Sequence, residues 1–349
     1  MQITTHNSLH RWTRNFVEWI APEPDDESAT WDHAQKVLEN IKNKAEENGL
    51  VVVDAVISGS LPKGTGLRRH LKGNSSVEGQ DIDLSFILEK EKDLLGNLKC
   101  LVPDFQSFAK LCYPDSEHPP LTKSSAPLKF IGKKLHYDLV PLFKSGNNDH
   151  QILVRTNGDE WKTSVLKHIE FTHSRVATSK DEWGIVKFSD MVRLFKWWRY
   201  EMQESSGVFG NEKGDHSIPS FLIDLLCAKA FDECGVKSTY PETLAMWFAY
   251  LENLAHNRDA VVFKDNYKTW EKDLNANWIV LDPVDKNNNV VGNYTKWNNR
   301  SIDELAKWLA DGRDHVNRAL RLADNGDESK AKAEFIKLFG SAYKNHTED

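Results

Sequence analysis

One segment, ISGSLPKGTGLRRHLKGNSSVEGQDIDLSFIL at residues 57–88, constrains this chain more than any other. It places a Gly-Ser and a Gly-Thr before two aspartates that are separated by one residue. DIDLSFIL is predicted to be a strand because its polar and apolar residues alternate at its start. Successive side chains of a strand point to opposite faces, so Asp81 and Asp83 share one face. The sequence therefore predicts two carboxylates that point the same way from one sheet.

A third acidic residue is expected in a later strand. PLKFIGKKLHYDLVPLF is predicted to be a hairpin that turns near Gly132 and Lys133, and its second strand carries Asp138. Carboxylates at inward strand positions are costly to desolvate unless a cation or a hydrogen-bond donor compensates. Three such acids on one sheet favour a metal site, and hard oxygen ligands suit Mg²⁺.

Two Mg²⁺ ions about 4 Å apart would hold an attacking hydroxyl and a leaving pyrophosphate in line, which is the chemistry of nucleotidyl transfer. The Gly-Ser turn suits the triphosphate. Gly59 lets a phosphate approach the backbone, Ser60 offers a hydroxyl, and a helix beginning at Leu61 would direct free N–H groups at the anion. A Gly-Ser or a DxD motif alone is more often an ordinary loop or turn, so the order of the motifs carries this prediction.

Composition limits the partners that such a site could serve. The chain has 349 residues, enough for two ordinary domains, and its 40% hydrophobic residues suffice for a packed core. A net charge of −7 argues against long nucleic acid as the main partner, because that affinity comes largely from Lys and Arg. No apolar run resembles a signal peptide or a membrane span, and the four cysteines form no CxxC pair, so we expect a cytoplasmic protein with no membrane partner.

The second half of the chain is predicted to be helical. One amphipathic helix is expected earlier, at residues 31–47, and the pattern changes from strands to helices near residue 175. Ser301 and Glu304 indicate a capping box at the start of a helix, and Gly340 indicates a helix end. The later helices are expected within residues 185–203, 218–233, 241–256, 301–323 and 326–340.

GSLPKGT, DIDLSFIL and LHYDLVPLF resemble the signature of the polymerase-β-like nucleotidyltransferases. Within them the chain resembles the CD-NTases, the group of oligoadenylate synthetase, cyclic GMP-AMP synthase and bacterial antiphage enzymes, since MVRLFKWWR, IPSFLIDLL and WIVLDPVDKNNNV are similar to segments of that group's helical domain. The CCA-adding enzymes share the catalytic half but are less similar beyond it. The resemblance implies a bilobal α+β fold, with a mixed-sheet catalytic domain at residues 1–175 and a helical oligoadenylate synthetase-like domain at residues 176–349.

The resemblance also implies roles for individual residues. Asp81 and Asp83 would bind two Mg²⁺ ions, with Mn²⁺ as an alternative, and Asp138 would bind the ion that activates the attacking hydroxyl. Gly59 and Ser60 would contact the donor triphosphate.

Three residues of the helical half match further family positions. Lys196 and Ser220 would contact phosphate, and Phe221 would stack on the nucleobase. The alternatives are a solvated helix face for Lys196 and the hydrophobic core for Phe221. The chain departs from the family in the long loop at residues 66–80, whose basic residues are either a solvated face or a contact for phosphates or an activating ligand.

The expected function is a template-independent nucleotidyltransferase that releases pyrophosphate while joining nucleoside triphosphates, ATP among them, into a short and cyclic signalling oligonucleotide in bacterial antiphage defence. A regulatory or effector protein is left open as a partner. One alternative is transfer of nucleotides to an RNA end or a protein side chain. Another is a nucleotide-binding sensor without turnover. The sequence leaves open the bases, the product length, the linkage, ring closure, the activator and the oligomeric state.

Overall fold

The structure is a computed structural model of the 349-residue chain. It describes residues 7–68, 70–72, 75–77, 81–89, 98–130, 135–146, 149–181, 186–204, 217–263, 267, 269–270, 276–294 and 297–347.

The chain divides into two compact units, and each is described by itself. One unit is Pro22–Phe171, and the other combines Met1–Ala21 with Thr172–Asp349. The predicted domain ranges, 1–175 and 176–349, differ from these units mainly at the N-terminus, because residues 1–21 group with the helical unit. Those ranges stay a prediction.

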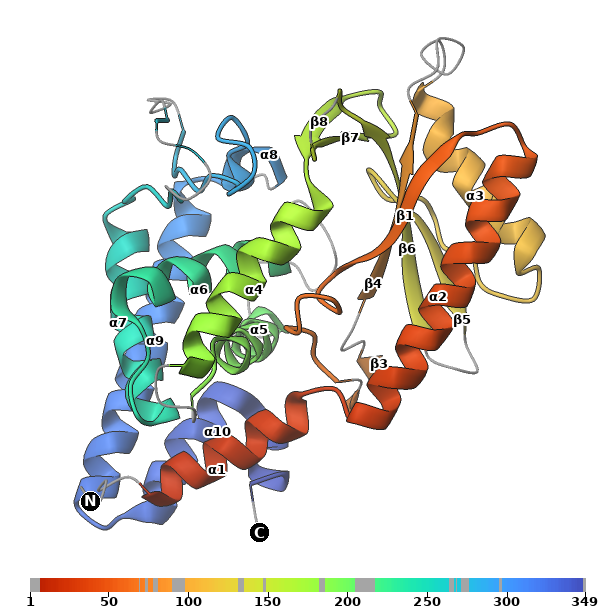
Figure 1. The fold of residues 1–349 in the computed structure, drawn as a ribbon. Coiled ribbons are helices and arrows are strands. Elements are labelled where there is room, and N and C mark those ends of the chain that lie inside the picture. The colour runs from red at the N-terminus through yellow and green to blue at the C-terminus, as the bar shows by residue number, and fades with distance from the viewer. Residues whose placement is uncertain are drawn as a thin grey trace. The chain divides into compact units, whose positions relative to one another are not determined.

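The unit Pro22–Phe171 is built on a six-stranded mixed sheet (Figure 1). Its strand order is β1-β4-β6-β7-β8, and β5 pairs with β6. The pairing of β4 with β6 is parallel, and the other pairings are antiparallel. A separate pair of short strands precedes β4. The strands are β1 (Val52–Gly59), β2 (His70–Lys72), β3 (Ser75–Val77), β4 (Asp81–Leu88), β5 (Ala126–Phe130), β6 (Leu135–Lys144), β7 (Gln151–Val154) and β8 (Glu160–Thr163).

The two faces of this sheet pack against different helices. Leu84 and Phe86 belong to the larger core cluster, which also takes in the apolar sides of α2 (Pro24–Glu47) and α3 (Leu101–Cys112). Ile87 and Leu142 face the other way and pack on Val165 at the start of α4 (Val165–Asp181). A short 3₁₀ helix, Leu98–Cys100, leads into α3. Since side chains alternate along a strand, Asp83 lies on the same face as Ile87.

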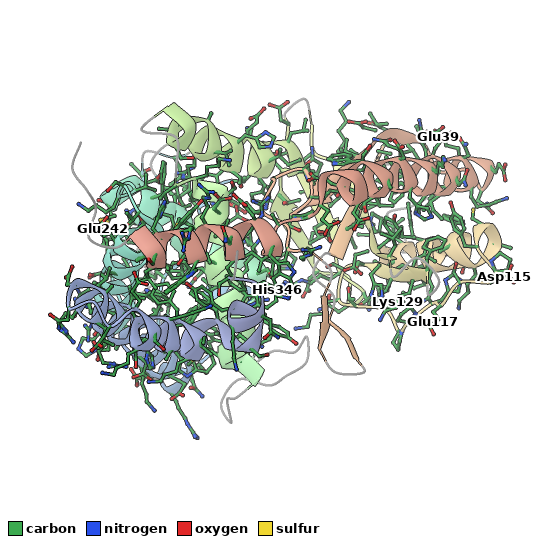
Figure 2. All side chains as sticks on the ribbon, turned by 90° about the horizontal axis from the view of Figure 1, so that it is seen from below. Glu39, Asp115, Glu117, Lys129, Glu242 and His346 are labelled. Atoms are coloured by element: carbon green, nitrogen blue, oxygen red, sulfur yellow. The ribbon has the colours of Figure 1, made fainter. Side chains whose placement is uncertain are left out.

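The sheet confirms the predicted mixed α+β fold and most of the expected strands. Helix α2 contains the expected helix 31–47 and ends as predicted at Asn48 and Gly49, whose N–H groups donate to the carbonyls of Ala45 and Glu46, respectively. The predicted hairpin of β5 and β6 is present, while its turn at residues 131–134 lies outside the described residues. Figure 2 labels Glu117 and Lys129, which lie close together. Their backbones exchange hydrogen bonds of 3.0 and 2.9 Å, which cover the outer edge of β5 locally.

The second unit is helical throughout its described elements. No helix within the described ranges has both the length and the apolar composition needed to cross a bilayer. The unit contains α1 (Asn7–Ile20), the C-terminal part of α4, α5 (Phe188–Glu204), α6 (Ser220–Cys234), α7 (Tyr240–His256), α8 (Val290–Tyr294), α9 (Asn299–Asp324) and α10 (Glu328–Asn345).

An aromatic cluster joins the first helix of the chain to the last. Phe16 of α1 is fully buried, and its ring meets those of Trp197 at 5.6 Å, Phe339 at 5.6 Å and Tyr343 at 5.1 Å. The indole N–H of Trp197 donates to the carbonyl of Phe339 at 3.0 Å. These contacts explain why α1, which the sequence did not predict as a helix, groups with α5 and α10.

The predicted helix ends need two corrections. The capping box at Ser301 and Glu304 is wrong, because α9 begins earlier and Asn298 accepts the N-terminal hydrogen bond from the N–H of Ser301. Glu304 instead accepts a hydrogen bond from the indole of Trp308 at 2.9 Å. Gly340 interrupts the helix as expected, with φ at +72°, but the helix resumes and continues to Asn345.

Candidate active site

Gly59 ends β1 beside one of the predicted catalytic acids. Its φ is +74°, a conformation that L side chains rarely adopt. A Cβ built on Gly59 would lie 2.0 Å from Oδ2 of Asp83, so no other residue fits without moving that carboxylate. The register explains the approach, because Ser58 and Gly59 pair with Asp83 and Ile82 of β4. Glycine is required here by the acid itself.

The Gly-Ser segment continues into a turn. Residues 60–64 form this turn, so the predicted helix at Leu61 is wrong. The turn closes locally: the N–H of Thr65 donates to the carbonyl of half-buried Ser60 at 3.1 Å, and the N–H of Gly64 donates to that of Leu61 at 3.0 Å. Gly64 takes a left-handed φ of +65°, which stops helical propagation. A phosphate bound here would therefore contact the end of β1 and the turn at residues 60–64, and no helix N-terminus at Leu61 would donate N–H groups to it.

Two of the three predicted metal-binding acids lie side by side. The parallel register of β4 and β6 pairs Asp83 directly with Asp138. Residues paired in this way share a sheet face and belong to strands about 4.8 Å apart. Both side chains are half-buried. Asp81 begins β4 opposite His136, and its side chain lies outside what the structure describes.

The described carboxylates fit a divalent metal ion. Among the side chains whose placement is described, no group of three His, Cys, Asp or Glu forms a metal cluster, and Asp81 is not among those side chains. Asp83 and Asp138 offer carboxylate oxygens from neighbouring strands, the hard donor set that Mg²⁺ and Mn²⁺ prefer. Their metal-binding role stays a prediction.

Sequence reasoning did not identify Ser125. Its hydroxyl donates to Oδ1 of Asp138 at 3.0 Å from the loop that precedes β5. The loop reads as a run of small polar residues, and no motif distinguishes this serine from its neighbours. Only the antiparallel pairing of Pro127 with Asp138 brings the loop to the acid.

In the helical unit, Lys196 is buried and paired. Its side chain is 5% exposed, and Nζ lies 2.8 Å from Oδ1 of Asp224 on α6. The alternative of a solvated helix face is therefore wrong for Lys196. Asp224 is a further residue that sequence reasoning missed.

Ser220 and Phe221 form the first turn of α6. Ser220 is exposed, and its Oγ accepts a hydrogen bond of 2.9 Å from Arg199, which also donates to the carbonyl of Ile218 at 2.9 Å. Phe221 is half-buried, so its ring is more exposed than those of the fully buried core residues. Arg199 lies one turn beyond Lys196 on α5, and Asp224 one turn beyond Ser220 on α6, so two polar cross-links join these helices.

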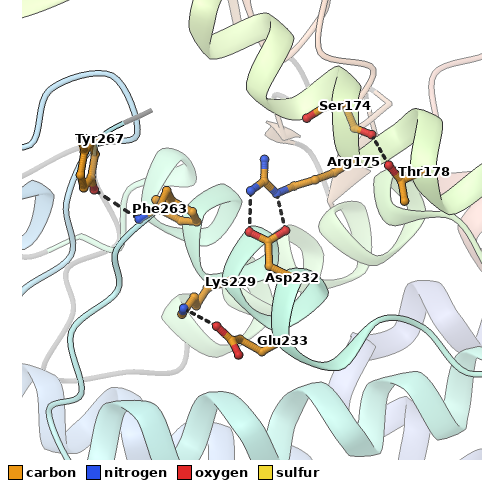
Figure 3. A network of polar contacts seen from close by, with 8 residues as sticks. All are labelled: Ser174, Arg175, Thr178, Lys229, Asp232, Glu233, Phe263 and Tyr267. Carbon is orange, nitrogen blue, oxygen red and sulfur yellow. Dashed lines mark hydrogen bonds and ion pairs between the residues drawn. The ribbon is translucent and has the colours of Figure 1, made fainter. Parts of the chain in front are cut away.

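A third cross-link fixes α6 to α4. Nε of Arg175 donates to Oδ1 of Asp232 at 2.8 Å, and Nη2 donates to Oδ2 at 2.5 Å (Figure 3). Arg175 is 5% exposed, and its guanidinium lies 5.6 Å from the ring centroid of Phe263. A bidentate arginine–carboxylate pair has a fixed geometry. Helix α6, which begins with Ser220 and Phe221, is thus linked to α5 near its start and to α4 near its end.

The mixed sheet and the helical unit match the α+β fold of the polymerase-β-like nucleotidyltransferases, which the sequence motifs resemble. No family model matches the sequence. The chain is 28% identical over 320 residues to "Cyclic AMP-AMP-AMP synthase" of Escherichia coli (strain MS 115-1), covering 90% of this chain and 91% of the relative. It is 21% identical over 290 residues to the "CBASS oligonucleotide cyclase CdnC" of Escherichia coli (strain KTE188), covering 81% and 84%.

Solved structures of a CD-NTase are also similar to this chain in fold and in sequence. The E. coli MS115-1 CdnC structure with ATP has a TM-score of 0.75 at 25% identity and covers 96% of this chain and 98% of that chain. The same CdnC in complex with HORMA-deltaN has a TM-score of 0.74 at 25% identity and covers 97% of each chain. The resemblance to the CD-NTases that the motifs indicated is therefore confirmed.

Proposed function

We propose that this chain is a nucleotidyltransferase that joins nucleoside triphosphates into a cyclic oligonucleotide second messenger in bacterial antiphage defence. The observation that carries the proposal is the pairing of Asp83 with Asp138 on parallel strands next to the Gly59 turn. The relatives support the product class, because they are named as a cyclic AMP-AMP-AMP synthase and a CBASS oligonucleotide cyclase.

We propose that Asp81, Asp83 and Asp138 would hold divalent ions, Mg²⁺ with Mn²⁺ as a substitute. Such ions would supply acidification of the attacking hydroxyl and charge neutralisation of the triphosphate. Gly59 leaves the space in which Asp83 reaches the turn, and Ser60 offers its hydroxyl to the donor triphosphate.

Within the helical unit, three residues are proposed to contact nucleotide. Lys196 carries the positive charge for a phosphate, Ser220 offers a hydroxyl, and Phe221 presents a half-buried ring to a base. Half-burial suits a stacking ring better than a core position would, because one face must stay accessible.

The partners are proposed from the same relatives. The CdnC structure with ATP supports ATP as a substrate, and the CdnC:HORMA-deltaN complex supports a HORMA-domain protein as regulator. We also propose that the chain works in the cytoplasm, where its four free cysteines would stay reduced.

The experiment is incubation of the purified chain with single and mixed nucleoside triphosphates and Mg²⁺ or Mn²⁺, with and without a HORMA-domain protein. Released pyrophosphate and a cyclic product identified by mass spectrometry are expected. Asp138→Asn should abolish both. Asp54→Asn is the matched control, since Asp54 is an exposed acid on β1 of the same sheet.

Two outcomes would contradict the proposal. In the same reactions with labelled nucleoside triphosphates, label that appears only on added RNA or protein would indicate an enzyme that extends RNA ends or modifies proteins. Nucleotide binding without pyrophosphate under every condition would indicate a sensor.

A further inference from the structure

The Asp138 carboxylate is held by a hydroxyl from outside its own strand. Ser125 is 5% exposed, and its Oγ lies 3.0 Å from Oδ1 of Asp138. An ionised carboxylate can only accept hydrogen bonds, so the single proton of the serine hydroxyl points at Asp138. Oγ of Ser125 is then left as an acceptor.

The donor to that acceptor is Thr122. Its Oγ1 lies 2.7 Å from Oγ of Ser125 and 3.3 Å from the carbonyl of the same residue. Oγ1 also accepts from the backbone N–H groups of Ser125 at 2.9 Å and Ser124 at 3.2 Å. With its acceptor side engaged, the threonine donates its one proton toward Ser125. The three groups form a one-way chain from Thr122 through Ser125 to Asp138.

The backbone under this chain is fixed on both sides. The N–H of Thr122 donates to the carbonyl of Ser125 at 3.1 Å, which closes the turn. The carbonyl of Lys123 accepts from the N–H of Thr156 at 2.8 Å and from its hydroxyl at 3.3 Å. The turn is therefore tied to the segment that follows β7, and the serine hydroxyl cannot easily move away from the acid.

We propose that Ser125, supported by Thr122, is a positioning residue that fixes the orientation of the Asp138 carboxylate toward a divalent ion. The inference rests on the proposed function, since it takes Asp138 as a metal-binding acid. A hydrogen bond to one carboxylate oxygen restricts rotation of the group and so sets the direction of the other oxygen. Hydrogen-bond partners of metal ligands typically contribute 10- to 100-fold to metal affinity or activity.

The test uses two variants of equal shape. Ser125→Thr keeps the hydroxyl and Ser125→Val replaces it with a methyl group, so the pair differs only in the hydrogen bond. S125V should lower kcat and the affinity for Mn²⁺, measured by electron paramagnetic resonance without turnover, by about 10- to 100-fold. KM for ATP should change less than about threefold, and S125T should restore most of both losses. If the extra methyl group of S125T and S125V prevents folding, S125A removes the hydroxyl without added bulk and is compared with the unchanged chain.

Thr122→Val is a milder variant because Thr122 is exposed and water can replace its donor. Thr122→Val should lower kcat and the affinity for Mn²⁺, both by less than S125V does. Equal Mn²⁺ affinity and equal kcat for S125V and S125T, with both folded, would overturn the positioning role. Full activity of Asp138→Asn would instead overturn the proposed function, so the two failures are distinguishable.

Discussion

At the scale of single residues, the geometry of the acids depends on two contacts from outside their own strands. Gly59 combines a left-handed φ of +74° with a carboxylate oxygen 2.0 Å from where its Cβ would be. Ser125 places its hydroxyl on Asp138 from a loop. Both residues act on the acids from outside the acidic strands, and so they set the geometry of the carboxylates.

Gly59→Ala should lower kcat much more strongly than its small effect on the free energy of unfolding would suggest. The left-handed backbone costs about 1–2 kcal/mol for any L residue, and displacement of Asp83 should lower kcat by about 100-fold. Gly49→Ala is the matched control, because Gly49 has φ at +87° with no atom within 4 Å of its Cβ position. Unfolding in urea and turnover should be measured for both. Equal turnover of the two variants would contradict this account of Gly59.

At the scale of elements, polar cross-links fix α6 along its length, from its first turn to its last. Lys196 and Arg199 of α5 reach Asp224 and the Ser220 hydroxyl, and Arg175 of α4 reaches Asp232. A buried ion pair contributes little net stability compared with apolar packing, but removal of one partner leaves an uncompensated charge. We therefore expect the pair of Lys196 and Asp224 to fix the position of the lysine side chain and to add little to the net stability of the unit.

Asp224→Asn should lower the free energy of unfolding by about 3 kcal/mol, because it removes the negative charge 2.8 Å from the buried ammonium group of Lys196. The double variant Lys196→Met with Asp224→Leu should recover most of that loss. If Lys196 contacts phosphate, the double variant should still raise KM for ATP at least tenfold. Urea unfolding and steady-state kinetics measure the two effects. An unchanged KM would show that the lysine is purely structural.

The elements that the sequence predicted well are those with their own periodicity. The strand DIDLSFIL and the helices around Lys196, Pro241 and Leu305 carry the pattern in the residues themselves. Helix α1 was not predicted, and its packing depends on distant residues, since the ring of Phe16 packs on that of Trp197, 181 positions away. The start of α9 was misplaced because Asn298 and Ser301 are both good caps and packing decides between them.

Only part of the candidate site's geometry could be predicted. Strand alternation and the order of the motifs led to Asp83 and Asp138, which the register places side by side, and their catalytic role stays a prediction. The turn after Gly59 was mistaken for a helix, because the left-handed Gly64 and the hydrogen bond from Thr65 to Ser60 depend on tertiary context. Partners such as Ser125 and Asp224 lie in segments without a motif, and only the fold brings them to the acid or the lysine.

At the scale of the whole molecule, a charged cluster joins the last two helices. Glu334 of α10 is 8% exposed and bonds Lys337 at 2.5 Å, His315 at 2.6 Å and Arg318 at 3.0 Å. Burial would raise the pKa of Glu334, but the hydrogen bonds from Lys337, His315 and Arg318 outweigh it and lower the pKa to about 2. The carboxylate is thus favoured in the folded chain.

This cluster predicts a pH-dependent stability. The folded pKa of about 2 lies below the ordinary value of 4.5, so its stabilisation is complete above pH 4.5 and is lost as the pH falls toward 2. Glu334→Gln should lower the free energy of unfolding at pH 7 by about 1–2 kcal/mol, a value reduced for the solvent exposure of Arg318 and Lys337. Urea unfolding of both chains at pH 7 and pH 3 measures it. A loss of the same size at both pH values would contradict the assignment.

The proposed chemistry requires neighbouring carboxylates of one sheet to hold divalent ions. Anomalous scattering from Mn²⁺ in crystals grown with a non-hydrolysable ATP analogue locates those ions. We expect a manganese peak about 2.2 Å from carboxylate oxygens of both Asp83 and Asp138, beside the triphosphate. A triphosphate bound with its manganese away from these two acids would contradict this expectation.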